Sequence, residues 1–160
     1  MWNYISRKTY NLFYRIKNLV YWFPVIWNDR NWDQYFYFTI MRHKLIAMRD
    51  FFNDDTKTMA VGNEIRAKEM DLCIKLLNRI LKDEYEENAF MWHDKKWGDI
   101  VMNLDNGKVN IYRPKAITEN EKEQELKEAK RLWNHTDNMK KQDIEYLHKI
   151  VTKYIQGWWD

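Results

Sequence analysis

Apolar residues recur at steps of three and four along most of this chain, and few residues interrupt that pattern. Only four glycines and two prolines occur in 160 residues, so long helices fit the sequence better than the short strands and frequent turns of a sandwich. Apolar residues make up 45% and charged residues 32%, enough for a chain of this length to bury one core. We predict a single mainly α domain over 1–160, a compact bundle of about five helices with one short β-hairpin.

The periodicity places the first helix at 2–23 and ends it there, because Pro24 disfavours helical geometry in the residue before it. Asp29 or Asn31 is then expected to cap the second helix, with Gln34 completing a variant capping box behind Asn31. The predicted helices after the first cover about 31–53, 64–87, 119–134 and 139–157.

Two local motifs add detail. Asn106-Gly107 predicts a two-residue hairpin turn between strands 100–104 and 108–112, because both residues accept a positive φ. A lone hairpin is marginal in water, so it should pack on the helices or pair with another subunit. Thr118 and Glu121 have the spacing of a capping box at the start of the fourth helix.

Signatures of catalysis and metal binding are missing from the sequence. It contains no glycine-rich phosphate loop, dinucleotide fingerprint or HExxH motif, and its four histidines are scattered. The single Cys73 excludes a disulfide framework and is expected in the core. His93 and Asp94 could serve acid–base chemistry, but a structural role beside the hairpin is the simpler interpretation. We therefore predict a protein that is not an enzyme and needs no cofactor or metal.

Charge and hydropathy restrict the partners and the compartment. A net charge of +3 is too balanced for a duplex nucleic-acid binder. The sequence shows no secretory signal and no apolar run that approaches the ~18 residues needed to span a bilayer. The expected location is the cytoplasm.

Aromatic residues are the unusual feature of the composition, with nine Trp, ten Tyr and seven Phe. Core and oligomer packing is one explanation. The other is a ligand site, because bases stack on aromatic rings and arginine binds phosphate. The candidate ligand-binding residues are Trp27, Arg30, Trp32, Tyr35, Arg42, Arg49, Arg66, Trp97 and Arg113.

Arg66 breaks the apolar face of its helix. A buried charge without a partner is costly, so either this end of the helix is exposed or Arg66 faces a polar cavity.

Four segments carry a resemblance to small tailed-phage proteins of unknown function. The chain resembles that family in two patterns. One is Trp-x-Pro-x-x-Trp-x-Asp-Arg-x-Trp-Asp, found here in "WFPVIWNDRNWD" (22–33), and the other is a closing Trp-Trp-Asp, found here in "GWWD" (157–160). The segments "MRHKLIAMRDFF" and "HDKKWG" extend the resemblance over most of the chain. Asn31 stands where the family has an acid, which weakens charge pairing at this corner.

The resemblance implies a phage protein acting in the cytoplasm of the infected host cell. By analogy with sponge proteins of phages, we expect a homo-oligomer that sequesters a small nucleotide-like signalling molecule to counter host defence. One alternative is a protein–protein inhibitor of a host factor. Another is a peripheral membrane-binding protein, because helix 2–23 is basic, amphipathic and rich in Trp and Phe. We expect this apolar face to pack on the second helix in preference to binding a membrane.

Overall fold

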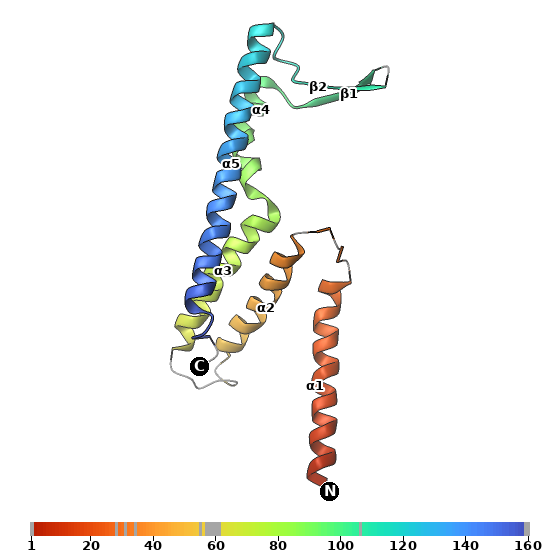
Figure 1. Ribbon diagram of the computed structural model, residues 1–160, viewed down its shortest axis with the longest axis vertical. Helices are drawn as coiled ribbons and strands as arrows, with labels where there is room; N and C mark the ends of the chain where they lie inside the picture. Colours follow the sequence, from red (N-terminus) through yellow and green to blue (C-terminus); the bar gives the residue numbers. More distant parts are fainter. Residues whose placement is uncertain are drawn as a thin grey trace. The chain divides into compact units, whose positions relative to one another are not determined.

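The computed structural model describes residues 2–27, 29–30, 32–33, 35–54, 56, 62–105 and 107–158, with the backbone alone at 2–8, 88 and 105. It is mainly α-helical with one antiparallel hairpin, as predicted (Figure 1). The chain divides into two units, Met1–Met70 and Asp71–Asp160. The single domain over 1–160 stays a prediction.

The first unit begins with α1 (Trp2–Ile26), which continues through Pro24. The prediction that this helix stops at Phe23 was therefore wrong. Proline removes one helical hydrogen bond, but the amide of Trp27 still donates to the carbonyl of Phe23 at 3.0 Å. So close to the end of a helix, proline costs one bond of the last turns and does not end the helix.

The second helix, α2 (Phe36–Phe52), begins five residues later than predicted. Tyr35 occupies the N-cap position without a side-chain cap. Asp33, two residues before Tyr35, accepts a hydrogen bond from the amide of Tyr35 through its Oδ1 at 2.9 Å. The predicted cap at Asp29 was wrong, while Asn31 and Gln34 lie outside the described residues.

The aromatic rings of Tyr21 and Trp22 on α1 lie against His43 of α2. Their centroids are 4.1 and 4.8 Å from that of the imidazole. On α2 itself Leu45 is buried, and four apolar residues that lie at helical spacing from it are half-buried: Phe38, Met41, Met48 and Phe52.

The predicted helix 64–87 is interrupted at Asp83, which separates α3 (Asn63–Lys82) from α4 (Glu84–Trp97). Asp83 has φ 52° and ψ 40°, a left-handed conformation that Asp tolerates better than most residues. Its carboxylate accepts from Lys140 Nζ at 3.0 Å. Three glutamates then occupy the first turn of α4, where the helix dipole favours negative charge.

The predicted helices 119–134 and 139–157 are one helix, α5 (Glu119–Tyr154). The residues between them are poor helix formers, but none is glycine or proline, so nothing breaks the backbone pattern. The hydroxyl of buried Thr136 donates to the carbonyl of Trp133 at 3.0 Å, and Lys141 pairs with Asp137 at 2.7 Å. The capping box of Thr118 and Glu121 is confirmed.

The hairpin joins β1 (Val101–Asp105) to β2 (Lys108–Tyr112), within one residue of the predicted strands. Met102 pairs with Ile111 and Leu104 with Val109, so these four side chains share one face. Within the described residues the hairpin packs on no helix and projects from the α4–α5 pair (Figure 1). Packing on the helices, one of the two predicted alternatives, is not observed there.

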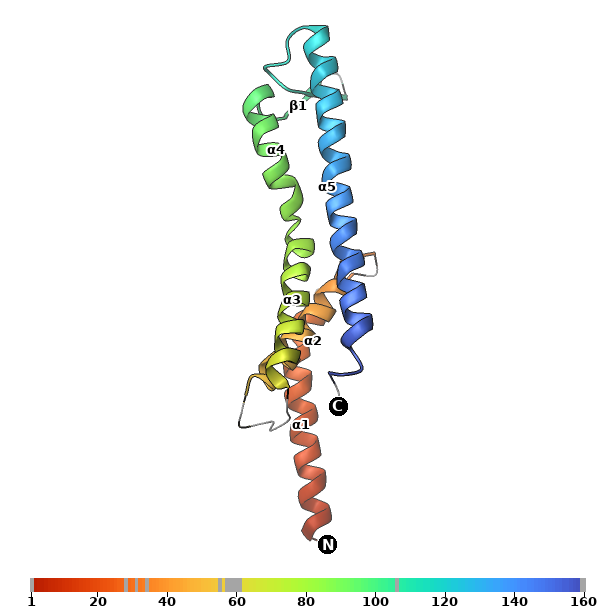
Figure 2. The ribbon, with the colours of Figure 1, turned by 90° about the vertical axis from the view of Figure 1, so that its left-hand side faces the viewer.

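In the second unit α4 and α5 lie side by side in both views (Figures 1 and 2). Cys73, Leu77 and Leu147 are fully buried, which confirms the prediction for the cysteine. Asp143 of α5 accepts from Tyr85 Oη at 2.5 Å and from Arg79 Nε at 2.9 Å. Burial and the bond to Asp143 raise the pKa of the Tyr85 hydroxyl, so Tyr85 stays a neutral donor.

Candidate functional site

The surface of α1 is the first candidate site. At about 100° per residue, Leu12, Ile16, Leu19 and Phe23 fall within one narrow arc of the helix. We call this arc, with its flanking Phe13, Val20, Ile26 and Trp27, the apolar face of α1. Every one of these side chains is exposed, Leu19 at 63% and Val20 at 66%. An exposed apolar patch of this length on a folded chain marks an interaction surface.

The apolar face does not pack on α2. Of the two residues that contact His43, Tyr21 lies on the opposite side of α1, and Trp22 lies at the edge of the apolar face next to Ile26. Trp22 is half-buried there, while Leu19 and Phe23 remain exposed. The expectation that α2 covers this face was therefore wrong. The ring of His43 on α2 contacts Tyr21 and Trp22 and leaves the apolar face exposed.

The charges of α1 are of one sign. Its sequence contains Arg7, Lys8, Arg15 and Lys17 and no acidic residue. Arg15 and Lys17 are exposed and border the apolar face on opposite sides. Among the described helices none is long and apolar enough to cross a membrane, α1 included.

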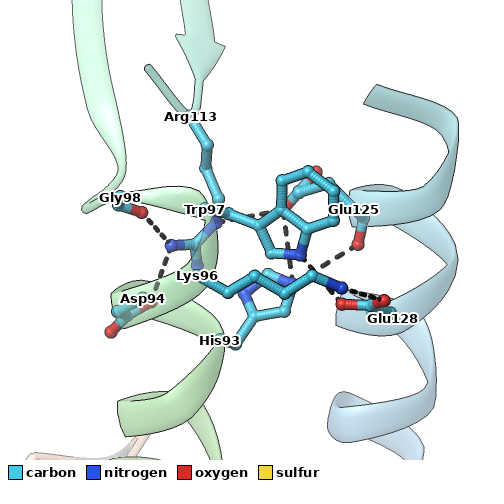
Figure 3. A network of polar contacts seen from close by, with 8 residues as sticks. All are labelled: His93, Asp94, Lys96, Trp97, Gly98, Arg113, Glu125 and Glu128. Carbon is cyan, nitrogen blue, oxygen red and sulfur yellow. Dashed lines mark hydrogen bonds and ion pairs between the residues drawn. The ribbon is translucent and has the colours of Figure 1, made fainter. Parts of the chain in front are cut away.

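The second candidate site is a polar network where α4, α5 and the residue that follows β2 meet (Figure 3). Arg113 is its centre, and the side chain is only 5% exposed. Its Nη1 donates to Asp94 Oδ1 and to the carbonyl of Gly98, both at 2.6 Å, and its Nε lies 3.0 Å from Glu125 Oε1. A buried guanidinium needs such partners, and here two carboxylates and a carbonyl provide them.

Gly98 makes this arrangement possible. It ends α4 with φ 82°, a conformation that L side chains rarely adopt. A Cβ at this position would lie 2.8 Å from Cγ of Pro114. Glycine therefore lets the chain turn sharply while its carbonyl still reaches Arg113.

The other half of the network joins α4 to α5. Lys96 Nζ and Trp97 Nε1 donate to the two carboxylate oxygens of Glu128, at 2.6 and 2.8 Å. These bonds, with that from Lys96 first, hold the pKa of Glu128 below its usual range. Buried His93 has its Nε2 3.4 Å from the carbonyl of Glu125, and its Nδ1 has no hydrogen-bond partner.

Two of the nine predicted site residues meet in this network, Trp97 and Arg113. Both are buried, and both bond to protein carboxylates. A ligand would have to displace those partners to use them. Their role in the structure is to fasten α4, α5 and the hairpin to one another.

The other seven predicted residues lie in the first unit. Trp27 and Trp32 are exposed at 67% and 82%, and the Trp27 ring packs on Phe23. Arg49 donates to Asp50 through Nε and Nη2, at 2.9 and 2.7 Å. The remaining four are distributed as follows: Arg30 is exposed, and Tyr35, Arg42 and Arg66 are half-buried.

The structure shows the surroundings of Arg66, which was expected either at an exposed helix end or in a polar cavity. It is half-buried, with Cζ 5.8 Å from the ring centroid of Phe52. The guanidinium can lie over a ring because it is more weakly hydrated than an ammonium group. Convergence of the seven residues on one shared cavity stays a prediction.

Three cavities are described in the second unit, and none is lined by those seven residues. One, of about 480 Å³, carries Glu86, Glu87, Asp94 and Asp99 beside Arg113. Another, of about 310 Å³, lies between α4 and α5 and is lined by Trp92 and Arg131 among others. Sequence reasoning missed Trp92 and Arg131, because their proximity depends on the antiparallel pairing of α4 with α5.

The described residues contain no group of three or more His, Cys, Asp or Glu side chains that could hold a metal ion. Comparisons with protein-family models, with curated proteins and with solved structures found no match to the chain.

Proposed function

We propose that this protein is a peripheral membrane-binding protein that attaches to an anionic lipid surface through α1. The observation that carries the proposal is the exposed apolar face of α1, bordered by cations and free of acids. Helices of this kind lie in the plane of the membrane interface, with the apolar side among the acyl chains and the basic side chains at the headgroups.

The size of each contribution fits this arrangement. Fully burying one Leu or Phe side chain contributes about 1.5–3 kcal/mol, and the apolar face offers Leu12, Leu19 and Phe23 among others. Each Lys or Arg near an anionic leaflet adds about 1 kcal/mol. Both terms favour the bound state. The apolar term is the larger, and the charges select anionic over neutral lipid.

The lack of acidic residues also argues against a second copy as the occupant of this face. Two α1 helices packed through their apolar faces would bring Arg15 and Lys17 of each copy close to like charges, with no carboxylate on either helix. Like-charge juxtaposition costs free energy at an interface. Anionic headgroups complement the same cations.

Flotation of the full chain with lipid vesicles tests the proposal. We expect co-flotation with vesicles of phosphatidylcholine and phosphatidylglycerol, and little with phosphatidylcholine alone. Leu19→Glu should abolish the binding, because it places a charge in the middle of the apolar face. Leu126→Glu is the matched control, since Leu126 of α5 is exposed at 68%, close to the 63% of Leu19.

Equal flotation of both variants would contradict a role for α1, and so would equal binding to charged and neutral vesicles. A homo-oligomer that buries the apolar face would appear in light scattering as a mass that Leu19→Glu lowers, with no vesicle binding by the parent chain. That result would replace the proposal.

A further inference from the structure

A groove on the second unit has the chemistry of a separate binding site. It has a volume of about 310 Å³ and lies between α4 and α5. Trp92 and Lys96 line it from α4, one turn apart, and Arg131 and Leu132 line it from α5. Buried His93 also contributes to its lining, and the Nδ1 atom of His93 has no hydrogen-bond partner.

Trp92 provides an open stacking surface. Its side chain is 67% exposed, although Trp92 lines the groove. Lys95 Nζ lies 5.2 Å from its ring centroid, so a cation is already close to this ring. A flat ligand ring placed on Trp92 would gain stacking contacts that solvent cannot supply.

Arg131 provides an open anion site. It is exposed and has no carboxylate partner among the described residues, whereas Lys96 is held by Glu128 at 2.6 Å. The lining of the groove contains two cations, Lys96 and Arg131, and one carboxylate, Glu128, which leaves an excess of positive charge. A guanidinium can bind two oxygens of a phosphate at once.

The charge of the groove differs from that of the larger cavity on the same unit. That cavity carries Glu86, Glu87, Asp94 and Asp99, and its single cation, Arg113, is already paired with Asp94 and Glu125. A phosphate would be repelled there and attracted in the groove.

We propose that the groove binds a small aromatic phosphate of the mononucleotide class, with the base on Trp92 and the phosphate on Arg131. This is the ligand class predicted from the sequence, on residues that the sequence did not indicate. None of the residues that line the groove belongs to the apolar face of α1, so each proposal can be tested without the other.

Calorimetric titration of the full chain tests the groove. The ligands are adenosine and guanosine monophosphate, with the matching nucleosides and inorganic phosphate as partial ligands. We expect at least one mononucleotide to bind more tightly than its nucleoside and than phosphate. Trp92→Ala and Arg131→Gln should each weaken that binding by about tenfold or more, as loss of one stacking or one charged contact does.

Neighbouring residues outside the groove provide the controls. Met91→Ala removes an exposed side chain next to Trp92, and Lys130→Gln removes a charge next to Arg131. Both should bind within about twofold of the parent chain, because neither residue lines the groove. Circular dichroism establishes that each variant is folded, which the exposure of all four positions favours.

Three results would overturn the proposal. The first is no binding of either mononucleotide. The second is equal binding of nucleotide and inorganic phosphate with no effect of Trp92→Ala, which would leave only charge attraction. The third is an equal loss in a groove variant and its control. Binding that survives Leu19→Glu would show that the groove acts without the membrane surface.

Discussion

The helices α1 and α5 have the same kind of sequence pattern but differ in the burial of their apolar residues. Both carry apolar residues at steps of three and four. On α5, Leu147 and Ile150 of that pattern are buried, and Ile144, Val151 and Tyr154 are half-buried. On α1, the corresponding leucines and aromatic residues are exposed. Periodicity therefore predicts a helix reliably, and it does not predict what covers the apolar side.

Charge distinguishes the two helices where periodicity does not. On α5 acids and bases alternate and pair with each other, as Lys127 does with Glu123 and Lys141 with Asp137. On α1 only bases occur. A helix with mixed charges is solvated on its polar side whatever lies nearby. A helix with one sign of charge is attracted to a surface of opposite charge, and for this reason we propose an anionic membrane as the partner of α1.

The largest effect is expected for Arg113→Met, which breaks the polar network of the second unit. It leaves Asp94 and Glu125 without their shared cation in a partly buried site, which costs about 3–5 kcal/mol. Thermal denaturation followed by circular dichroism should show a large fall in Tm. Arg15→Met on α1 is the control and should leave Tm nearly unchanged, because Arg15 is exposed. Equal shifts would remove the contrast between the two regions.

Replacing one buried and one exposed leucine compares the burial of α5 with that of α1. Leu147→Ala should lower the free energy of unfolding by about 2–5 kcal/mol, because it leaves a cavity at a fully buried position. Leu19→Ala should change it by less than about 0.5 kcal/mol, because Leu19 is 63% exposed. Urea denaturation measures both. A cost of several kcal/mol for Leu19→Ala would mean that the apolar face of α1 is covered in the free protein.

Two glycines separate backbone strain from steric clash. Gly98→Ala should destabilise the chain by about 2 kcal/mol or more, because a positive φ is combined with a Cβ that meets Pro114. Gly107→Ala has a similar φ and no atom within 4 Å of the new Cβ, so only the strain of about 1 kcal/mol remains. If both substitutions cost the same, the clash of the new Cβ with Pro114 contributes nothing to the loss of stability.

The smallest effect concerns pH. The bonds from Lys96 and Trp97 keep the pKa of Glu128 below its ordinary value of 4.5. Their stabilisation is therefore complete above about pH 4.5 and is lost as pH falls through the lower pKa of the folded state. Glu128→Gln should make the loss of stability below pH 4.5 less steep, by well under about 1 kcal/mol. An unchanged acid limb in denaturation scans would contradict this role.

Much of the fold could be predicted from the sequence, because local signals dominate where they are strong. The capping box of Thr118 and the strands beside Gly107 were predicted closely. The errors concern the residues at which helices begin, end or continue. Asp83 ends α3 with its carboxylate bonded to Lys140, and Thr136 continues α5 with its hydroxyl bonded within the helix.

The candidate sites were less predictable than the helices. The sequence predicts that α1 is basic and amphipathic, but the exposure of its apolar face depends on which side of α1 contacts α2. Arg113 was singled out as a ligand-binding residue, and the structure places it among protein carboxylates. Proximity across α4 and α5 has no local sequence signal, so Trp92 and Arg131 could not be paired in advance.

Fluorescence from probes on α1, with and without vesicles, directly tests whether the apolar face of α1 enters the membrane. An environment-sensitive fluorophore would be attached at Val20→Cys, on the apolar face, and at Asn11→Cys, on the other side of α1. The natural Cys73 is fully buried and should not react in the folded chain. With vesicles containing phosphatidylglycerol, we expect a blue shift at position 20 and none at position 11. A probe at position 20 that is already blue-shifted without lipid, or that does not respond to vesicles, would show that this face does not enter the membrane.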